Sequence, residues 1–86
     1  SDEAWYALGF AQLAQRDCPS AMPTLQKVLF NYPKSSKAGD ALVAIGACQS
    51  AQNDKVAAKK TFTAVLAQYP NTPAAEQALR QLNNIK

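Results

Sequence analysis

The sequence predicts an all-α protein built from two repeated helix pairs and one further helix. Apolar residues recur at helical spacing without strand-like alternation, and only three glycines occur among the 86 residues. The segment from Tyr32 to Ala41 returns thirty-seven residues later as the segment from Tyr69 to Ala78. Each copy contains a proline, which ends one helix, and then Ser35 or Thr72, which can cap the next helix. A joint that is used twice predicts a repeat array.

The first pair of helices is expected between residues 2 and 32. Its first helix, residues 2–15, has acidic residues in the first turn, where a helix N-terminus favours negative charge. Gly9 lies inside this helix and is expected to mark the close approach of another backbone, since glycine weakens a helix by about 1 kcal/mol relative to alanine. The second helix is expected to begin late, with Ser20 as its cap, because Pro23 then falls in the first turn. The apolar residues of this pair are Ala4, Trp5, Leu8, Ala11, Leu13, Ala21, Met22, Leu25, Val28 and Leu29.

Three more helices are expected at about residues 37–52, 56–69 and 73–85. Gly46 again lies inside a helix, and Asn53 with Asp54 forms the turn after it, with Asp54 as the cap of the next helix. The last helix has no second helix to complete a pair and is expected to form a terminal cap. The residues expected to face inward are Ala41, Leu42, Ile45, Cys48, Ala58, Phe62, Val65, Leu66, Ala78, Leu79 and Leu82.

The composition argues against several functional classes. Nine basic and six acidic residues give a net charge of +3, and the basic residues are scattered, so we expect no nucleic-acid binding. No apolar run approaches the roughly 18 residues that a membrane-spanning helix needs, so we expect no direct membrane insertion. The chain lacks histidine, and most carboxylates lie at helix starts or turns. We therefore expect no catalytic residues, no metal ligands and no cofactor, and the protein is not expected to be an enzyme.

The residues that recur at the offset of thirty-seven resemble the tetratricopeptide repeat family. They are Trp5, Leu8, Gly9, Ala21, Leu25, Val28 and Pro33 in the first pair, and Leu42, Ile45, Gly46, Ala58, Phe62, Val65 and Pro70 in the second. The resemblance implies a tetratricopeptide-repeat superhelix of two helix pairs plus a C-terminal capping helix, in a single domain over residues 1–86. The repeats are expected at about residues 2–36 and 37–72, and the terminal helix at about 73–86. The usual repeat is about 34 residues long, so each joint here is lengthened.

The lengthened joint contains a tyrosine, a proline, a hydroxyl residue and alanines, and it points to a smaller family among the tetratricopeptide proteins. Together with the segments 42–46 and 57–62, it resembles the C-terminal domain of the YbgF (CpoB) family of Tol-Pal system proteins. The resemblance implies a periplasmic adaptor of Gram-negative bacteria that binds TolA and links outer-membrane constriction to septal peptidoglycan synthesis, with the septal synthase machinery as a further partner. It also implies an N-terminal coiled coil that makes the full-length protein a trimer, whereas this domain alone is expected to be monomeric.

Other interpretations remain open at this point. Outer-membrane assembly lipoproteins of the BamD type carry similar Tyr-Pro joints, which would make the chain a structural scaffold, and a generic tetratricopeptide adaptor is a further alternative. A peptidoglycan-acting enzyme would need a catalytic set of residues outside this sequence. A coiled coil before this domain would indicate the Tol-Pal adaptor, and a lipidated cysteine would indicate the scaffold.

The resemblance also implies a binding surface. The first helix of each tetratricopeptide pair lines a concave face, and the corresponding residues are Glu3, Tyr6, Phe10, Leu13, Asp40, Val43, Ala47, Ser50, Gln77, Arg80 and Asn84. Tyr6 and Phe10 lie four residues apart and are expected to form an exposed aromatic pair that anchors a partner. The alternative is that they pack against an upstream segment. One subgroup of tetratricopeptide proteins binds a terminal carboxylate through a lysine and asparagines on this face. Tyr6 and Phe10 stand where those residues would begin, so we expect the partner to be an apolar segment rather than a terminal carboxylate.

The two cysteines allow two interpretations. Cys18 lies in the first turn between helices and Cys48 lies near the end of the third helix, places that a right-handed helix stack can bring near one another. In an oxidising compartment they can form a disulfide; otherwise Cys18 is an exposed thiol and Cys48 is a small buried residue. The spacing does not decide between the two, and the second repeat has Lys55 where the first has Cys18.

Overall fold

Five helices account for most of the chain, as the helical spacing predicts. The computed structural model describes residues 1–85. Its helices are α1 (Asp2–Ala14), α2 (Cys18–Asn31), α3 (Ala38–Ala51), α4 (Lys55–Gln68) and α5 (Pro73–Asn84). No strand occurs among the described residues, so the predicted all-α fold is confirmed.

The turns within the two pairs have the same construction. Arg16 and Asn53 adopt left-handed φ angles of 62° and 63°. The aspartate that follows each of them caps the next helix, because its carboxylate accepts a hydrogen bond from a first-turn amide, at 3.3 Å for Asp17 and 3.2 Å for Asp54. Each pair therefore reverses the chain through one left-handed residue and one capped helix start.

The expected late start of the second helix is wrong. α2 begins at Cys18, with Asp17 rather than Ser20 as its cap, and Pro23 lies inside the helix. Pro19 occupies the first turn, where its missing N–H removes no intrahelical bond. Pro23 removes one hydrogen bond to the carbonyl of Pro19, but both prolines are exposed, so water can hydrate that carbonyl. The aspartate cap therefore determines where α2 begins.

The two joints between pairs are capped differently. Thr72 caps α5 as expected, because its hydroxyl oxygen accepts from the N–H of Ala75 at 3.1 Å. Ser35 does not cap α3, since the cap position is Lys37 and no side chain bonds to the helix there. Instead, Ser35 accepts from the N–H of Lys37 at 3.0 Å and donates its hydroxyl proton to the carboxylate of Asp2. This contact with α1 holds Ser35 in a turn that precedes the helix.

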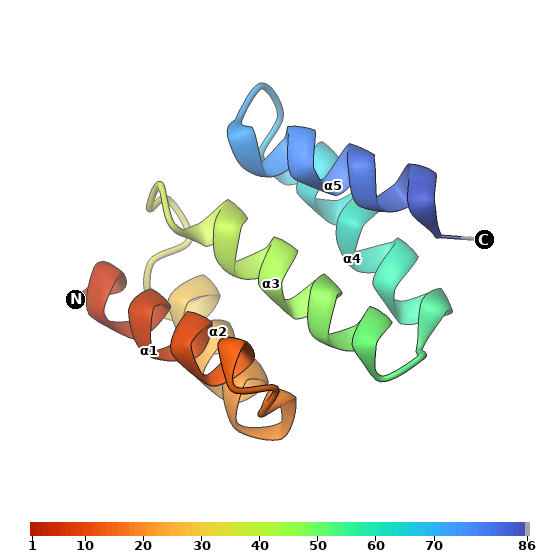
Figure 1. Cartoon of the computed structure of the whole chain (residues 1–86). Helices are drawn as coiled ribbons and strands as arrows, with labels where there is room; N and C mark the ends of the chain where they lie inside the picture. The colour runs from red at the N-terminus through yellow and green to blue at the C-terminus, as the bar shows by residue number, and fades with distance from the viewer. Residues whose placement is uncertain (86) are drawn as a thin grey trace.

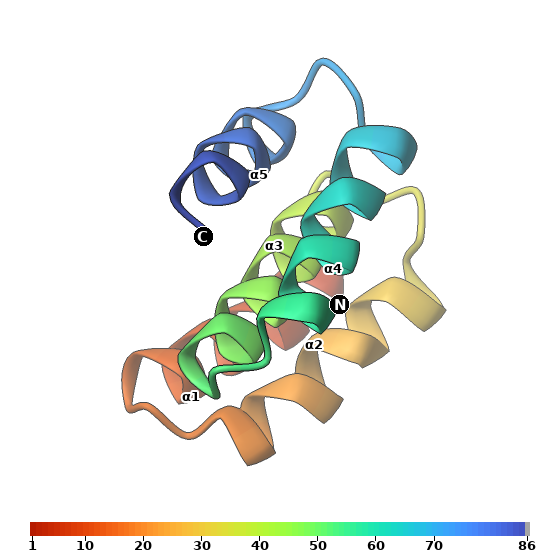
Figure 2. The same cartoon turned by 90° about the vertical axis from the view of Figure 1, so that its right-hand side faces the viewer.

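The helices form two layers. α1, α3 and α5 lie side by side in one layer, and α2 and α4 lie behind them (Figure 1). In the view turned by 90°, α2 and α4 lie on the right-hand side (Figure 2). Within residues 1–85, α3 contacts both α1 and α5, whereas α2 and α4 do not contact each other. The closer spacing in the first layer curves the array toward α1, α3 and α5.

Two buried clusters fill the space between the helices. The first cluster joins α1, α2 and α3, the second joins α3, α4 and α5, and Leu42 packs against both. The buried residues of the first cluster are Cys18, Ala21, Leu25, Val28, Ala41, Ala44, Ile45 and Cys48, and those of the second are Ala58, Phe62, Val65, Ala74 and Ala78. Alanine is common in both clusters, which allows the helices to approach closely.

The expectation that Leu79 is buried is wrong. Leu79 is 51% exposed, whereas Leu42, thirty-seven residues earlier, packs against both clusters. No helix follows α5 among the described residues, so nothing there covers α5 as α4 covers α3. Leu8 on α1 is 47% exposed for the converse reason, because α2 precedes and covers its counterpart Ile45 but no described helix precedes α1.

Gly9 and Gly46 mark close contacts within the two pairs, but the nearest atoms belong to side chains and not to the backbone that was expected at Gly9. A Cβ atom on Gly9 would lie 2.6 Å from Cδ2 of Leu25, and one on Gly46 would lie 2.7 Å from Cε1 of Phe62. Both distances are far shorter than an ordinary contact between carbon atoms. Leu25 and Phe62 are fully buried, so neither side chain can turn into solvent to make room for a methyl group. The position thirty-seven residues after Gly46 is Asn83 on α5, and Asn83 is exposed.

Equivalent polar residues take different partners in the two pairs. Thr61 donates its hydroxyl proton to the side-chain oxygen of Gln49 across the second pair. Thr24, thirty-seven residues before Thr61, donates instead to the carbonyl of Ser20 at 3.1 Å. The side-chain oxygen of Gln12, the counterpart of Gln49, is buried and accepts no hydrogen bond from the described part of the chain. The repeated sequence therefore does not produce repeated side-chain bonding.

Replacement of Gly46 by alanine tests the glycine contact. Alanine favours the helix by about 1 kcal/mol, but its methyl group must displace the buried ring of Phe62, and such overpacking costs about 1–3 kcal/mol. We therefore expect Gly46→Ala to lower the free energy of unfolding, by up to about 2 kcal/mol, in urea denaturation followed by circular dichroism. Asn83→Ala is the matched control at the equivalent exposed position and should be neutral or slightly stabilising. A Gly46→Ala protein as stable as the parent would contradict the contact.

Candidate functional site

The candidate site is the outer surface of the layer formed by α1, α3 and α5. Because the array curves toward this layer, its outer surface is the concave one. The residues predicted to bind a partner come from these three helices, with Tyr6 on α1, Asp40 on α3 and Arg80 on α5. Helical repeat arrays bind partners along such extended concave surfaces.

Tyr6 and Phe10 form an aromatic pair on α1. Their ring centroids are 5.9 Å apart, and the ring planes are tilted by 31°. Phe10 is 53% exposed, whereas Tyr6 is half-buried and packs against the first cluster. One ring is therefore held by the core and the other is open to solvent, an arrangement that suits an anchor for a partner.

Charged groups at the start of α3 lie around the Tyr6 ring. Nζ of Lys37 lies 5.4 Å from the ring centroid, within the range of a cation–π interaction. Partial burial raises the pKa of the Tyr6 phenol above its usual 10.0, and the carboxylate of Asp40 acts in the same direction. Tyr6 therefore stays protonated at physiological pH and can donate a hydrogen bond to a partner.

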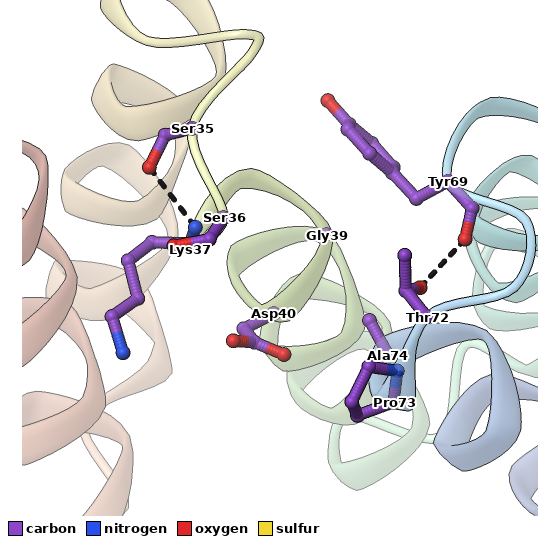
Figure 3. A pocket seen from close by; sticks show the side chains of 9 residues that line it. All are labelled: Ser35, Ser36, Lys37, Gly39, Asp40, Tyr69, Thr72, Pro73 and Ala74. Carbon is purple, nitrogen blue, oxygen red and sulfur yellow. Dashed lines mark hydrogen bonds between the residues drawn. The ribbon is translucent and has the colours of Figure 1, made fainter.

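Asp40 also lines a pocket between the two joints. The pocket has a volume of about 330 Å³ and opens between the N-terminal ends of α3 and α5 (Figure 3). Lys37 extends from this region toward α1 in Figure 3, so the pocket adjoins the aromatic pair. Its lining combines hydroxyl groups with apolar surface, and consists of Ser35, Ser36, Lys37, Gly39, Asp40, Tyr69, Thr72, Pro73 and Ala74.

Both copies of the Tyr-Pro joint build this pocket. The hydroxyl of Tyr69 donates to the carbonyl of Pro33 at 3.1 Å, which ties the second joint to the first. Gly39 permits the contact, since a Cβ atom there would lie 3.1 Å from Cβ of Ala74 and 3.3 Å from Cγ of Tyr69. In the sequence the joints mark helix boundaries, and their repetition is the only signal that they meet in space.

A hydrogen bond joins α1 to the first joint beside the pocket. The hydroxyl of Ser35 donates to the carboxylate of Asp2, and this bond lowers the pKa of Asp2 below its usual 3.8. A lowered pKa means that the stabilisation is present above pH 3.8 and is lost as the pH falls through the lower folded-state value. Asp2 also places negative charge in the first turn of α1, where the helix dipole favours it.

The other residues predicted to line the face divide into packed and exposed positions. Leu13 packs against the first cluster and Val43 against the second, and both are half-buried. Two further residues on α3, Ala47 and Ser50, are half-buried. The remaining residues, on α1 and α5, are exposed; they are Glu3, Gln77, Arg80 and Asn84. Of the predicted set, Tyr6 has Phe10 and Asp40 as neighbours and so links α1 to α3.

A disulfide joins Cys18, the first residue of α2, to Cys48 on α3. Their Cα atoms are 5.6 Å apart, a usual separation for a disulfide. Both residues belong to the first cluster, in which Cys18 is 6% exposed and Cys48 is fully buried. The bond crosses the boundary between the first pair and α3, so it holds the two repeats together covalently.

Residues 1–85 contain neither a metal-binding cluster of side chains nor a membrane-spanning helix. Within residues 1–85, no group of three or more His, Cys, Asp or Glu side chains could hold a metal ion. None of the helices in the same range is long and apolar enough to cross a membrane. The candidate site is made from aromatic, hydroxyl and charged side chains on the concave layer.

The curved two-layered array, with an aromatic pair on its inner face, defines a helical-repeat module for protein–protein interaction. Residues 3–35 and 40–72 each match the family described as Tetratricopeptide repeat. These two segments cover most of the chain, so the chain belongs to the tetratricopeptide repeat family, which forms scaffolds for protein–protein interaction. A comparison with curated proteins finds no match to the chain.

Removal of the disulfide tests how strongly it stabilises the array. The bond joins residues 30 positions apart, and a loop of that size contributes about 3–4 kcal/mol in the chain-entropy description. We expect a variant with both Cys18→Ala and Cys48→Ala to melt at least about 10 °C lower than the oxidised protein, as measured by circular dichroism. Dithiothreitol should lower the melting temperature of the parent but not that of the variant. Equal melting temperatures for the oxidised parent and the variant would contradict a stabilising disulfide.

Proposed function

We propose that this chain is the partner-binding domain of a periplasmic Tol-Pal adaptor of the YbgF (CpoB) type. Its partner is TolA, a segment of which binds on the concave face formed by α1, α3 and α5. Through that contact the full-length protein links outer-membrane constriction to septal peptidoglycan synthesis. In the full-length protein an N-terminal coiled coil assembles three copies, whereas this domain alone is monomeric.

The observation that carries the proposal is the aromatic pair on the concave layer. A partner that covers the exposed ring of Phe10 removes apolar surface from water, and full burial of such a side chain is worth about 1.5–3 kcal/mol. Tyr6 adds a ring that the first cluster already holds in place, so little side-chain freedom is lost on binding. Lys37 and Asp40 supply charges of both signs beside that ring. The face therefore suits a mainly apolar segment with polar groups at its edge.

Two further features support the family and the compartment. The lengthened Tyr-Pro joints resemble those of the YbgF (CpoB) family, and in this structure they meet through the bond from Tyr69 to Pro33. Disulfides persist in oxidising compartments such as the bacterial periplasm and are rare in the reducing cytosol. The bond between Cys18 and Cys48 thus supports a periplasmic location.

Alanine substitution of the aromatic pair tests the proposed face. Tyr6→Ala and Phe10→Ala are each expected to weaken binding of soluble TolA by at least about 1 kcal/mol, roughly fivefold in Kd, because each removes a buried ring from the interface. Isothermal titration calorimetry on the purified domain measures the change, and circular dichroism confirms that each variant is folded.

Phe30→Ala is the matched control for this experiment. Phe30 is 86% exposed, but it lies on α2, in the layer that does not form the concave face. Its replacement should leave the affinity unchanged. Weaker binding by Phe30→Ala but not by Phe10→Ala would place the interface on the other layer, and a parent domain that does not bind TolA would refute the Tol-Pal assignment.

A further inference from the structure

The geometry points to Cys18 as the sulfur through which the disulfide is made and broken. We infer that the pocket beside Cys18 admits the reacting sulfur of glutathione or of a dithiol oxidoreductase, and that Cys48 reacts only with Cys18. This inference concerns a surface on the α1–α2 turn and the end of α3, whose lining includes Leu13 of the predicted face but neither Tyr6 nor Phe10. It does not depend on the proposed binding of TolA.

The two cysteine residues differ in their exposure to solvent. Cys18 begins α2 and is 6% exposed, whereas Cys48 has no exposed surface. Cys48 lies within the first cluster beside Ala44 and Ile45, which are themselves buried. Thiol–disulfide exchange requires the attacking sulfur to reach the sulfur that it attacks. We therefore expect an external thiol to reach Cys18 from the adjoining pocket, and to reach Cys48 only when the core opens.

An open pocket leads to Cys18. It has a volume of about 390 Å³, and it is formed by the α1–α2 turn and the C-terminal end of α3. Cys18 is part of its lining and Cys48 is not. The residues that line it are Leu13, Arg16, Cys18, Pro19, Ala51 and Gln52. The apolar walls and a single cationic side chain suit a small thiol or the tip of a loop that carries one.

A cationic and an anionic residue precede Cys18 in the sequence. Cys18 is the first residue of α2, in a first turn where Pro19 has no N–H and the N–H of Ser20 is paired with Asp17. Arg16 lines the same pocket as Cys18, and its positive charge attracts an incoming thiolate. The neighbouring carboxylate of Asp17 is engaged as the helix cap with the N–H of Ser20.

Reduction of the disulfide then follows one order of events. The external thiolate attacks Sγ of Cys18; a bond forms between these two sulfurs, and the bond from Cys18 to Cys48 breaks. The electron pair of the broken bond leaves on Cys48 as a thiolate, which takes a proton from water. A second thiol of the reductant attacks the sulfur now bound to Cys18 and releases Cys18 as a thiolate. The protein disulfide is reduced, and the two external thiols are oxidised to a disulfide.

Formation of the disulfide is the reverse sequence. The Cys18 thiolate attacks an external disulfide and releases one of its sulfurs as a thiolate, which leaves a mixed disulfide on Cys18. Cys48 loses its proton to water and attacks Sγ of Cys18, which releases the second external sulfur. In both directions the species that can be trapped carries the external group on Cys18.

Single-cysteine variants test this assignment. Cys48→Ser retains only Cys18, and Cys18→Ser retains only Cys48, so neither variant contains the disulfide and the two are matched in that respect. Each is incubated with oxidised glutathione, quenched with acid and analysed by mass spectrometry. We expect Cys48→Ser to form the mixed disulfide at least about tenfold faster than Cys18→Ser under native conditions. In concentrated guanidinium chloride the two rates should converge, whereas similar rates in the native state would overturn the inference.

A second pair of variants tests the pocket as the route. In the Cys48→Ser background, Ala51→Phe places a bulky ring on the pocket wall and should slow the reaction at least about threefold. Ala67→Phe is the control, since Ala67 is an exposed alanine on α4. An unchanged rate with Ala51→Phe would show that this pocket is not the route.

The oxidised parent protein provides a test that needs no substitution. It is incubated with reduced glutathione, quenched with acid, alkylated and digested, and the position of the mixed disulfide is read by peptide mass spectrometry. Glutathione on Cys18 and an alkylated Cys48 are the expected products. Glutathione found mainly on Cys48 would overturn the proposal, whatever the stability of the single-cysteine variants.

Discussion

The close contact that glycine permits within each helix pair sets the geometry of the whole array. Leu25 and Phe62 lie against Gly9 and Gly46 at distances that leave no room for a Cβ atom. Both pairs use this contact at the same offset, so they have similar shapes and stack in the same way. Stacked pairs place α1, α3 and α5 in one layer, where neighbouring helices touch, and this spacing makes that layer concave. The candidate binding face therefore depends on two glycines that do not belong to it.

Most of the fold could be predicted because the residues that end its helices act on the backbone locally. Prolines restrict the backbone at their own positions, so the joints and the repeat period indicate five helices without knowledge of the packing. It was harder to predict which of two nearby residues caps a helix. Asp17 and Ser20 both precede a helical run, and Asp17 caps α2 because its carboxylate reaches the amide of Ser20. The exposure of Leu79 was not predictable from spacing either, since it depends on whether another helix covers α5.

The candidate site could be predicted only where one helix presents it. Tyr6 and Phe10 share a face of α1 because they lie four residues apart, and helical periodicity is sufficient to show this. The adjoining pocket depends instead on the hydrogen bond from Tyr69 to the carbonyl of Pro33, which joins two copies of the same joint. A pattern within one repeat carries no information on how two repeats meet. The cation–π contact of Lys37 with Tyr6 was missed for the same reason.

The disulfide makes the two junctions between repeats unequal. The positions of Cys18 and Cys48 recur thirty-seven residues later as Lys55 and Ile85, so the junction of α4 with α5 relies on packing without a covalent bond. Ile85 is half-buried against the second cluster, and packed side chains can shift where a disulfide cannot. The aromatic pair and the start of α3 lie on the covalently held side of the array, whereas α5 lies on the other. Adjustment to a bound partner is therefore expected mainly at the α5 end of the concave face, while α1 and α3 act as a rigid anchor.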